Sequence, residues 1–310
     1  MTRHAVPPGR ETSTPTPMPT DLARAGLRLW VMSDLRIDRL PLDLPDPPDF
    51  DVLVVAGNVC PGIDASVRWL TEALRGRHGG RPVVLVPGNV EFWDPRPKAL
   101  NLRDGRAAAA AHGVTLLSDA AVRVEDRDGG GVHIVGSTLW TDWALHGPRT
   151  ATNARSYARR AHPDNRRITL GDGVPYWPHD AAGAHARSRA FIEDVLVSVK
   201  VTGEGFGASP AALVRDVRRG DRAVVVTHHA PSQASLCGRL SPDVCEPWVS
   251  ASFASDVEDL MVMWGAPRAW IHGHVPTPTD HRIGRCRVVA NPRSRLGRVE
   301  VFDPSFIVEA

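Results

Sequence analysis

The sequence predicts an α/β fold in which two packed β-sheets are flanked by helices. Short apolar runs recur along the chain and end in Gly, Asn, Asp or His, which is typical of buried strands that present polar groups at their tips. Segments with helical character lie between these runs. Other apolar runs are separated by hairpin-like turns, including a Gly-rich turn at residues 126–131. This mixture of βαβ units and hairpins is the basis of the two-sheet prediction.

The predicted strands and helices are assigned to the following residues. Strands with polar tips are predicted at residues 27–32, 52–56, 82–86, 223–226 and 269–271. Strands of the hairpin type are predicted at residues 114–117, 121–124, 132–135, 287–290 and 298–302. Helices are predicted at residues 65–75, 97–111, 184–199 and 253–264.

The domain organisation follows from where these elements begin and stop. Residues 1–26 are rich in Pro and Thr, and we predict that they form a disordered tail. Residues 27–310 are predicted to form a single domain, because no segment has the patterning of a second core. Residues 144–182 are rich in Arg, Pro, Gly and His with weak periodicity, and we predict a surface excursion over the strand tips.

Composition and charge argue against several classes of protein. The 37 basic and 35 acidic residues give a net charge of +2, which does not indicate a surface for nucleic acid or membranes. No apolar run approaches the roughly 20 residues that span a bilayer, and the N-terminal residues lack the apolar segment of a secretory signal. The four cysteines form no C-x-x-C pair and are predicted to be reduced. We therefore expect a cytoplasmic protein.

Five strand tips carry short motifs in order along the chain. They read S-D-L-R at 33–36, G-N-V-C at 57–60, G-N-V-E at 88–91, T-H-H-A-P at 227–231 and G-H-V-P at 273–276. This order and spacing resembles the calcineurin-like metallophosphoesterases, whose motifs are D-x-H, G-D, G-N-H-E, H-H and G-H-x-H. The resemblance implies a four-layer α/β/β/α sandwich with two divalent metals at the strand tips, which activate water for phosphoester hydrolysis.

The resemblance implies roles for eight positions, of which this chain retains four. Asp34 matches an aspartate ligand of the first metal. Three further residues match ligands of the second metal, namely Asn89, His228 and His274.

The other four positions are replaced. Arg36 and Pro276 stand where histidines of the first metal belong, and Asn58 stands where the bridging aspartate belongs. Val90 stands at the position of the catalytic histidine. Valine and proline have no side-chain group that ligates a metal or transfers a proton, so no catalytic residue is assigned.

The retained residues predict at most one metal. Asn89, His228 and His274 are candidates for a single site, with Asp34 and Asn58 as weaker ligands. The three main ligands carry no charge, whereas Mg²⁺ and Mn²⁺ favour carboxylates and Zn²⁺ accepts imidazoles. We expect one divalent cation, Zn²⁺ or Mn²⁺, or none.

Two arginines are predicted to bind a ligand. The guanidinium of Arg36 is predicted to occupy the vacated region of the first metal and to pair with Asp34. Arg293, in the N-P-R run at 291–293, is placed to reach a phosphate.

Two functions follow from these observations. The first is a non-catalytic or weakly active relative of the phosphoesterases that binds a phosphate-bearing small molecule or a protein partner. The alternative is a phosphomonoesterase or phosphodiesterase that uses a single metal or ligands recruited from loops. Purified protein of the second kind should contain a metal and lose both metal and activity when His274 is replaced.

Overall fold

A first β-sheet is built mainly from the N-terminal part of the chain. The structure is a computed structural model that describes residues 26–236, 247–296 and 299–310. The strand order is β15-β1-β2-β3-β4, with β1 to β4 parallel and β15 antiparallel to β1. These strands are β1 (Arg28–Met32), β2 (Val52–Val55), β3 (Val83–Leu85), β4 (Val114–Leu116) and β15 (Ile307–Glu309).

A second sheet is built mainly from the C-terminal half. Its order is β11-β12-β10-β9-β6-β5, with the four inner strands parallel and an antiparallel strand at each edge. These strands are β5 (Ala120–Glu125), β6 (Gly131–Ser137), β9 (Arg222–Thr227), β10 (Ala269–His272), β11 (Thr279–Ile283) and β12 (Cys286–Ala290).

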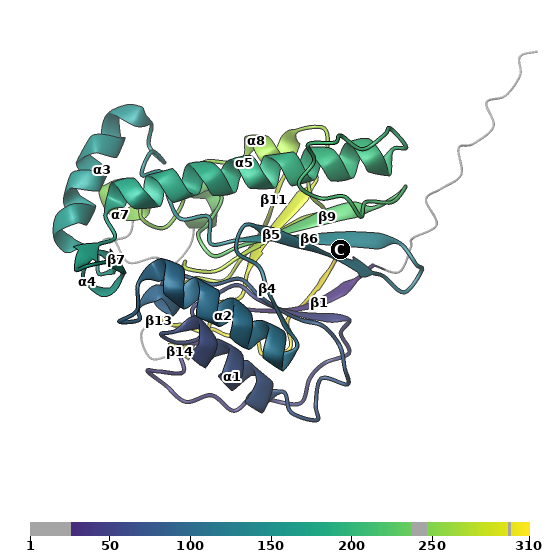
Figure 1. Cartoon of the computed structure of the whole chain (residues 1–310), viewed down its shortest axis with the longest axis horizontal. Helices are drawn as coiled ribbons and strands as arrows, with labels where there is room; N and C mark the ends of the chain where they lie inside the picture. Colours follow the sequence, from purple (N-terminus) through teal and green to yellow (C-terminus); the bar gives the residue numbers. More distant parts are fainter. Residues whose placement is uncertain (1–25, 237–246, 297–298) are drawn as a thin grey trace, which may run out of the picture.

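Three apolar clusters hold four layers together. The middle cluster joins the sheets through side chains such as Val31 and Val54 on one sheet and Val224 and Ile271 on the other. A second cluster packs the outer face of the first sheet against α1 (Ile63–Ala73) and α2 (Lys98–His112). A third packs the outer face of the second sheet against α5 (Pro178–Gly203) and α8 (Asp259–Val262). Figure 1 shows these helix pairs on opposite sides of the strands, which confirms the predicted α/β/β/α sandwich.

Alternation along each inner strand explains why the strands were predictable. In β1, Leu29 and Val31 face the other sheet, while Trp30 and Met32 face the helices. Both faces are therefore buried, and the strand is a continuous apolar run.

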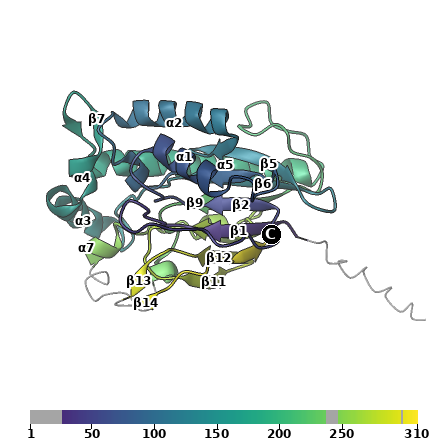
Figure 2. The ribbon, with the colours of Figure 1, turned by 90° about the horizontal axis from the view of Figure 1, so that it is seen from below.

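The segment predicted as a surface excursion contains regular structure. It includes α3 (Pro148–Ala161), α4 (Asp164–Arg167), β7 (Thr169–Gly171) and β8 (Val174–Pro175). With α7 (Pro247–Ser250), these elements lie at the end of the molecule opposite the C-terminus (Figures 1 and 2). Helix α3 was not predicted, because its buried stripe consists only of Ala151, Ala154 and Ala158.

The prediction of a helix at residues 253–264 is wrong, because only α8 lies within that range. Ala254 instead forms a parallel bridge with Ala230, and the backbone N–H groups of Ser255 and Val257 bond to the segment that follows β9. These tertiary hydrogen bonds hold the backbone extended where local sequence favours a helix.

Several other predictions fall wholly or partly on residues that the structure does not describe. Residues 1–26, predicted to form a disordered tail, lie almost entirely outside the described part of the chain, as do Cys237 and Cys245, whereas Cys60 and Cys286 are buried free thiols. Of the strand predicted at 298–302, β14 (Val299–Glu300) is present and pairs with β13 (Arg295–Leu296). Short 3₁₀ turns occur at η1 (Val90–Phe92) and η2 (Gln233–Leu236). Among the described helices, none has both the length and the apolar character needed to cross a membrane.

Candidate functional site

The five predicted motifs meet at one edge of the sandwich. Four of their residues have left-handed backbone conformations, with φ of 53° at Asp34, 41° at Arg36, 60° at Asn58 and 65° at His274. Such conformations are unfavourable for residues other than glycine and concentrate at functional sites, where tertiary contacts hold them. Here the backbone N–H groups of Asp34 and Arg36 donate to carbonyls in the neighbouring turn after β2.

The Asp34 carboxylate is held by hydrogen bonds within the protein. Its Oδ1 accepts from the Asn58 side-chain amide at 2.9 Å, and its Oδ2 accepts from the backbone N–H of His274 at 2.9 Å. The Asn58 Oδ1 in turn accepts from the backbone N–H of Val90 at 2.9 Å. The Asn58 amide therefore bridges two motifs at the position where the resemblance implies a carboxylate bridging two metals.

The prediction that Arg36 pairs with Asp34 is wrong. The Arg36 guanidinium binds both carboxylate oxygens of Asp38, from Nε at 2.9 Å and Nη2 at 2.7 Å, and lies 5.3 Å from the ring centroid of Trp93. The left-handed turn at Arg36 brings Asp38, two residues later, alongside it. Both oxygens of Asp34 instead accept hydrogen bonds from Asn58 and from the His274 backbone.

Three donor atoms from separate strand tips converge. The His228 Nδ1 lies 2.7 Å from the carbonyl of Ala56, to which it donates when the ring is neutral. The His228 Nε2 then directs its lone pair toward Asn89 Oδ1 and His274 Nδ1, each 3.2 Å away. The structure thus brings together the three residues predicted to form a single metal site.

Burial keeps the neighbouring imidazoles neutral. Desolvation lowers the pKa of His274 and of His229 well below the usual range, and the proximity of the rings to one another adds to the effect. The two rings lie 4.2 Å apart between centroids. Burial also lowers the pKa of His272 to about 4. Neutral imidazoles have a free lone pair, which is the form that ligates metals.

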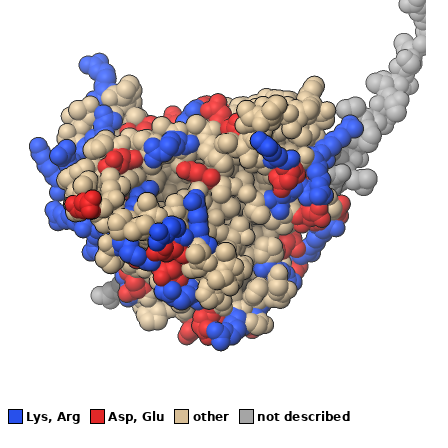
Figure 3. All heavy atoms as spheres, viewed as in Figure 1, with Lys and Arg blue, Asp and Glu red and all other residues tan. Residues whose placement is uncertain are grey.

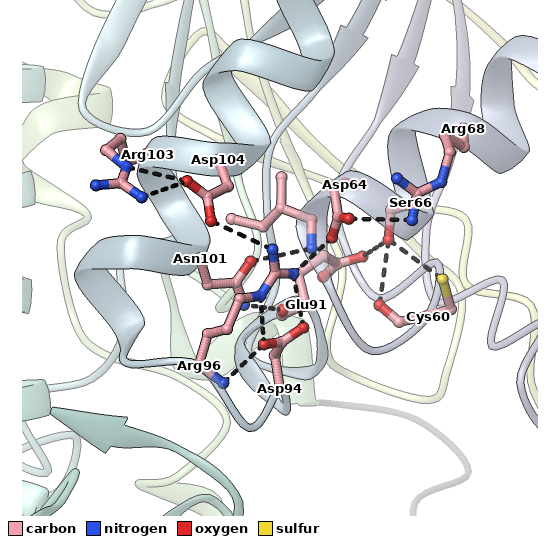
Figure 4. A network of polar contacts seen from close by, with 11 residues as sticks. Cys60, Asp64, Ser66, Arg68, Glu91, Asp94, Arg96, Asn101, Arg103 and Asp104 are labelled. Carbon is pink, nitrogen blue, oxygen red and sulfur yellow. Dashed lines mark hydrogen bonds and ion pairs between the residues drawn. The ribbon is translucent and has the colours of Figure 1, made fainter. Parts of the chain in front are cut away.

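The Glu91 side chain stabilises the turns that follow the strands. Its buried carboxylate accepts backbone N–H groups from Asn58, Val59 and Gly88 at 2.6–2.8 Å. Figure 4 shows Glu91 with Ser66 and Asn101, which donate to its side chain and its carbonyl. Desolvation raises the pKa of Glu91, while the nearby His228 and the three backbone N–H groups act in the opposite direction. Glu91 therefore fixes the backbone of the turns rather than facing a ligand.

Arg293 is also committed to structure. Its Nη1 donates to the carbonyls of Leu35 and Leu40, and its Nη2 donates to the carbonyl of Pro41. Arg293 nevertheless forms part of the cavity wall described next, so its positive charge contributes to the field of the site.

A cavity of about 690 Å³ opens above the strand tips. Among the described residues on its wall, Asp34 is the only acidic one, whereas Arg36, Arg39 and Arg293 contribute basic groups. Aromatic rings form much of the remaining wall, which includes Trp93, Trp143, Tyr157, Trp248 and Phe253. Helix α3 forms one side and contains four arginines and no acidic residue. Figure 3 shows basic side chains along the edge of the molecule where α3 lies.

Two residues that sequence reasoning did not select complete the site. Asp164 is buried, and its Oδ1 accepts from the Asn89 side-chain amide at 3.0 Å and from the Trp93 indole at 2.6 Å. This contact orients the Asn89 amide so that its oxygen faces His228. His162 lines the cavity beside Asp164. The only signal for either was the presence of histidines in a poorly patterned segment, which does not distinguish a site residue from a surface residue.

The residues present do not fit a pair of metals. Asp34 is the only ligand left for the first metal, and both of its oxygens already accept hydrogen bonds. Across the described residues, no group of three or more His, Cys, Asp or Glu side chains is arranged to hold a metal ion. Asn89, His228 and His274 offer two imidazoles and an amide oxygen, a donor set that fits one borderline cation such as Zn²⁺ and suits Mg²⁺ poorly.

Comparison with solved structures supports the fold. The chain matches phosphopantetheinyl hydrolase from Mycobacterium tuberculosis with a TM-score of 0.63 and 21% sequence identity, over 87% of this chain and 90% of that one. This chain has the calcineurin-like metallophosphoesterase fold. A dimetal phosphatase from Danio rerio matches more weakly, with a TM-score of 0.44 and 10% identity over 86% of this chain and 87% of that one. No family model and no curated protein sequence matches this chain.

Proposed function

We propose that the protein binds a small phosphate-bearing molecule in the cavity above the strand tips and does not hydrolyse it by the two-metal route. One observation carries this proposal. The cavity combines a basic and aromatic wall with a centre in which Asp34 is hydrogen-bonded to Asn58 rather than free for a metal.

The charge of the wall favours an anion. The charge of Arg36 is balanced by Asp38, but on the described part of the wall Arg39 and Arg293 outnumber the single carboxylate of Asp34, which gives the cavity a positive potential. Arg39 is exposed, and its guanidinium forms no ion pair with any residue in the described part of the chain. It is therefore available for a phosphate, to which arginine binds with charge-assisted hydrogen bonds.

The aromatic wall favours a ligand that also has an apolar or planar part. The rings of Tyr157 and Trp248 lie 6.1 Å apart, and both are substantially exposed at 44% and 40%. Exposed aromatic pairs beside a cavity provide contact area for a ligand at little conformational cost. A phosphopantetheinyl group, named in the solved structure that matches the fold, combines a phosphate with an extended organic body and is one candidate.

Two-metal hydrolysis is disfavoured by the chemistry of the site. The positions of the catalytic histidine and of one metal ligand are occupied by Val90 and Pro276, which offer neither a donor atom nor a proton. Loss of acid–base assistance alone reduces rates by about 10² to 10⁴. Loss of the metal that generates the nucleophile removes a further large contribution.

Binding can be tested with phenylphosphonate, which joins an aromatic ring to a phosphate-like group that is not hydrolysed. Isothermal titration calorimetry should detect binding to the full chain, and Arg39→Ala should weaken it by about tenfold. Arg103→Ala is the matched control, because Arg103 is an exposed arginine that pairs with Asp104 outside the cavity.

4-Nitrophenyl phosphate with Zn²⁺ or Mn²⁺ should show no turnover above that of the metal alone. Failure of phenylphosphonate and 4′-phosphopantetheine to bind would contradict the proposal.

The convergence of three donor atoms favours a second candidate, a hydrolase with a single metal. In that case Zn²⁺ should bind at about one ion per chain, and His274→Ala should abolish both binding and turnover of 4-nitrophenyl phosphate. His179→Ala serves as control, because the His179 side chain is 68% exposed and lies outside the cavity wall. Zinc binding without turnover would leave the non-hydrolytic proposal in place.

A further inference from the structure

A histidine on the cavity wall, His162, is paired with a buried carboxylate of α4, Asp164. The Nδ1 of His162 lies 3.5 Å from the Oδ2 of Asp164. Their side chains are 17% and 7% exposed, so the pair is largely shielded from bulk solvent, while His162 lines the cavity. The ring of His162 also packs edge-on against Trp143, with 5.7 Å between centroids. The separation is long for a hydrogen bond, as is common for site pairs before a ligand binds.

Asp164 is held in place independently of His162. Its Oδ1 accepts two hydrogen bonds, from Asn89 and Trp93, which leaves Oδ2 to face the imidazole. A carboxylate anchored in this way fixes the tautomer of a neighbouring histidine, because the ring nitrogen that faces it retains the proton. With Nδ1–H toward Asp164, neutral His162 has its lone pair on Nε2.

The remaining nitrogen of His162 is available for chemistry. No hydrogen bond joins Nε2 to another residue in the described part of the chain, and the side chain lines the same cavity as Arg36, Arg39 and Arg293. A neutral imidazole oriented by a carboxylate is a nucleophile, and a guanidinium group on the same cavity wall, such as that of Arg39, stabilises charge on a bound phosphoryl group. This arrangement requires no metal.

We propose that His162 is a phosphoryl acceptor whose reactive tautomer is set by Asp164, an activity that rests on the phosphate-binding function proposed above. The Nε2 lone pair forms a bond to phosphorus, and the bond between phosphorus and the leaving oxygen breaks. The leaving group departs with the electron pair, as acetate when the donor is an acyl phosphate. The ring then carries a positive charge, which the Asp164 carboxylate stabilises.

Acetyl phosphate provides a direct test with the full chain in the presence of EDTA. Intact-mass analysis should show the gain of one phosphoryl group, with the acid-labile and base-stable behaviour of phosphohistidine, and peptide mapping should place it on His162. His162→Gln should lose the adduct. Asp164→Asn should form it about 10²-fold more slowly, because the positioning carboxylate is lost.

A matched pair outside the cavity supplies the control. His179 lies 3.6 Å from Asp180 and is exposed, so His179→Gln should leave the adduct unaffected. An adduct on His179, or one that persists in His162→Gln, would overturn the inference. Binding of phenylphosphonate without any adduct would also overturn it while leaving the proposed binding function intact. Absence of phenylphosphonate binding would instead count against the binding function itself.

Discussion

Replacing Asn58 with Asp should convert a hydrogen bond at the centre of the site into a repulsive contact. The Asn58 amide nitrogen lies 2.9 Å from Asp34 Oδ1, and Asn58 is only 5% exposed. In Asn58→Asp, an oxygen takes the place of this nitrogen. Two carboxylates would then face each other at hydrogen-bonding distance.

The magnitude follows from that distance. At an effective dielectric constant of about 20, two unit charges 2.9 Å apart repel by about 6 kcal/mol. Taking up one proton relieves the repulsion, and for an aspartate with an unfolded pKa near 3.9 this costs about 1.4 kcal/mol per pH unit above that value. The smaller of these two costs sets the loss of stability, which should be about 1.5 kcal/mol at pH 5 and about 5.5 kcal/mol at pH 8. A proton shared between the two carboxylates raises the pKa of this pair in the folded state above its unfolded value. The stability of Asn58→Asp therefore falls as pH rises.

Urea unfolding at several pH values measures this directly. The free energy of unfolding of Asn58→Asp should approach that of the wild type near pH 4 and fall progressively below it toward pH 8. The double variant Asp34→Asn, Asn58→Asp is the matched control. It exchanges donor and acceptor, so all three hydrogen bonds among Asp34, Asn58, His274 and Val90 can still form with a single charge. Mn²⁺, which prefers carboxylates, should stabilise the single variant more than the wild type.

Two results would refute this reasoning. A loss of stability in Asn58→Asp that does not change with pH would mean that packing, rather than charge, is responsible. A double variant no more stable than the single variant at pH 8 would mean that the two side chains are not coupled as the structure indicates.

Two further predictions concern charged groups away from the cavity. Desolvation acts to raise the pKa of Asp221, but hydrogen bonds from Arg123 and His133 help to lower it to about 2. Asp221→Asn should lower the free energy of unfolding by about 3 kcal/mol at pH 7. This difference should disappear in urea titrations as pH falls from about 4 to 2, and its persistence there would contradict an electrostatic origin. Burial lowers the pKa of Lys98 to about 8 within a box of three aromatic rings 4.9–5.1 Å away. Lys98→Met should therefore raise the unfolding free energy by about 1–3 kcal/mol at pH 7. This gain in stability should shrink above pH 8. Destabilisation of the variant at pH 7 would show that the cation–π contacts outweigh the cost of burying the charge.

The sequence by itself determined the layers and the losses at the site. Strands buried on both faces must be continuously apolar, so β1, β2, β3, β9 and β10 were evident as runs ending in polar tips. Val90 and Pro276 lack donor atoms whatever the fold around them, so the incomplete metal centre was also readable from residue type alone.

The tertiary structure decided which partner each remaining polar group has. Asp34 bonds to Asn58 and to the His274 backbone, and Arg36 bonds to Asp38, because left-handed turns set the direction of each side chain. Such conformations depend on contacts with other strand tips and leave no periodic signal in the sequence. His162, which is paired with Asp164, reaches the cavity only because α3 and α4 fold back over the tips. Residue type therefore fixed what the site lacks, whereas packing between distant segments fixed what it contains.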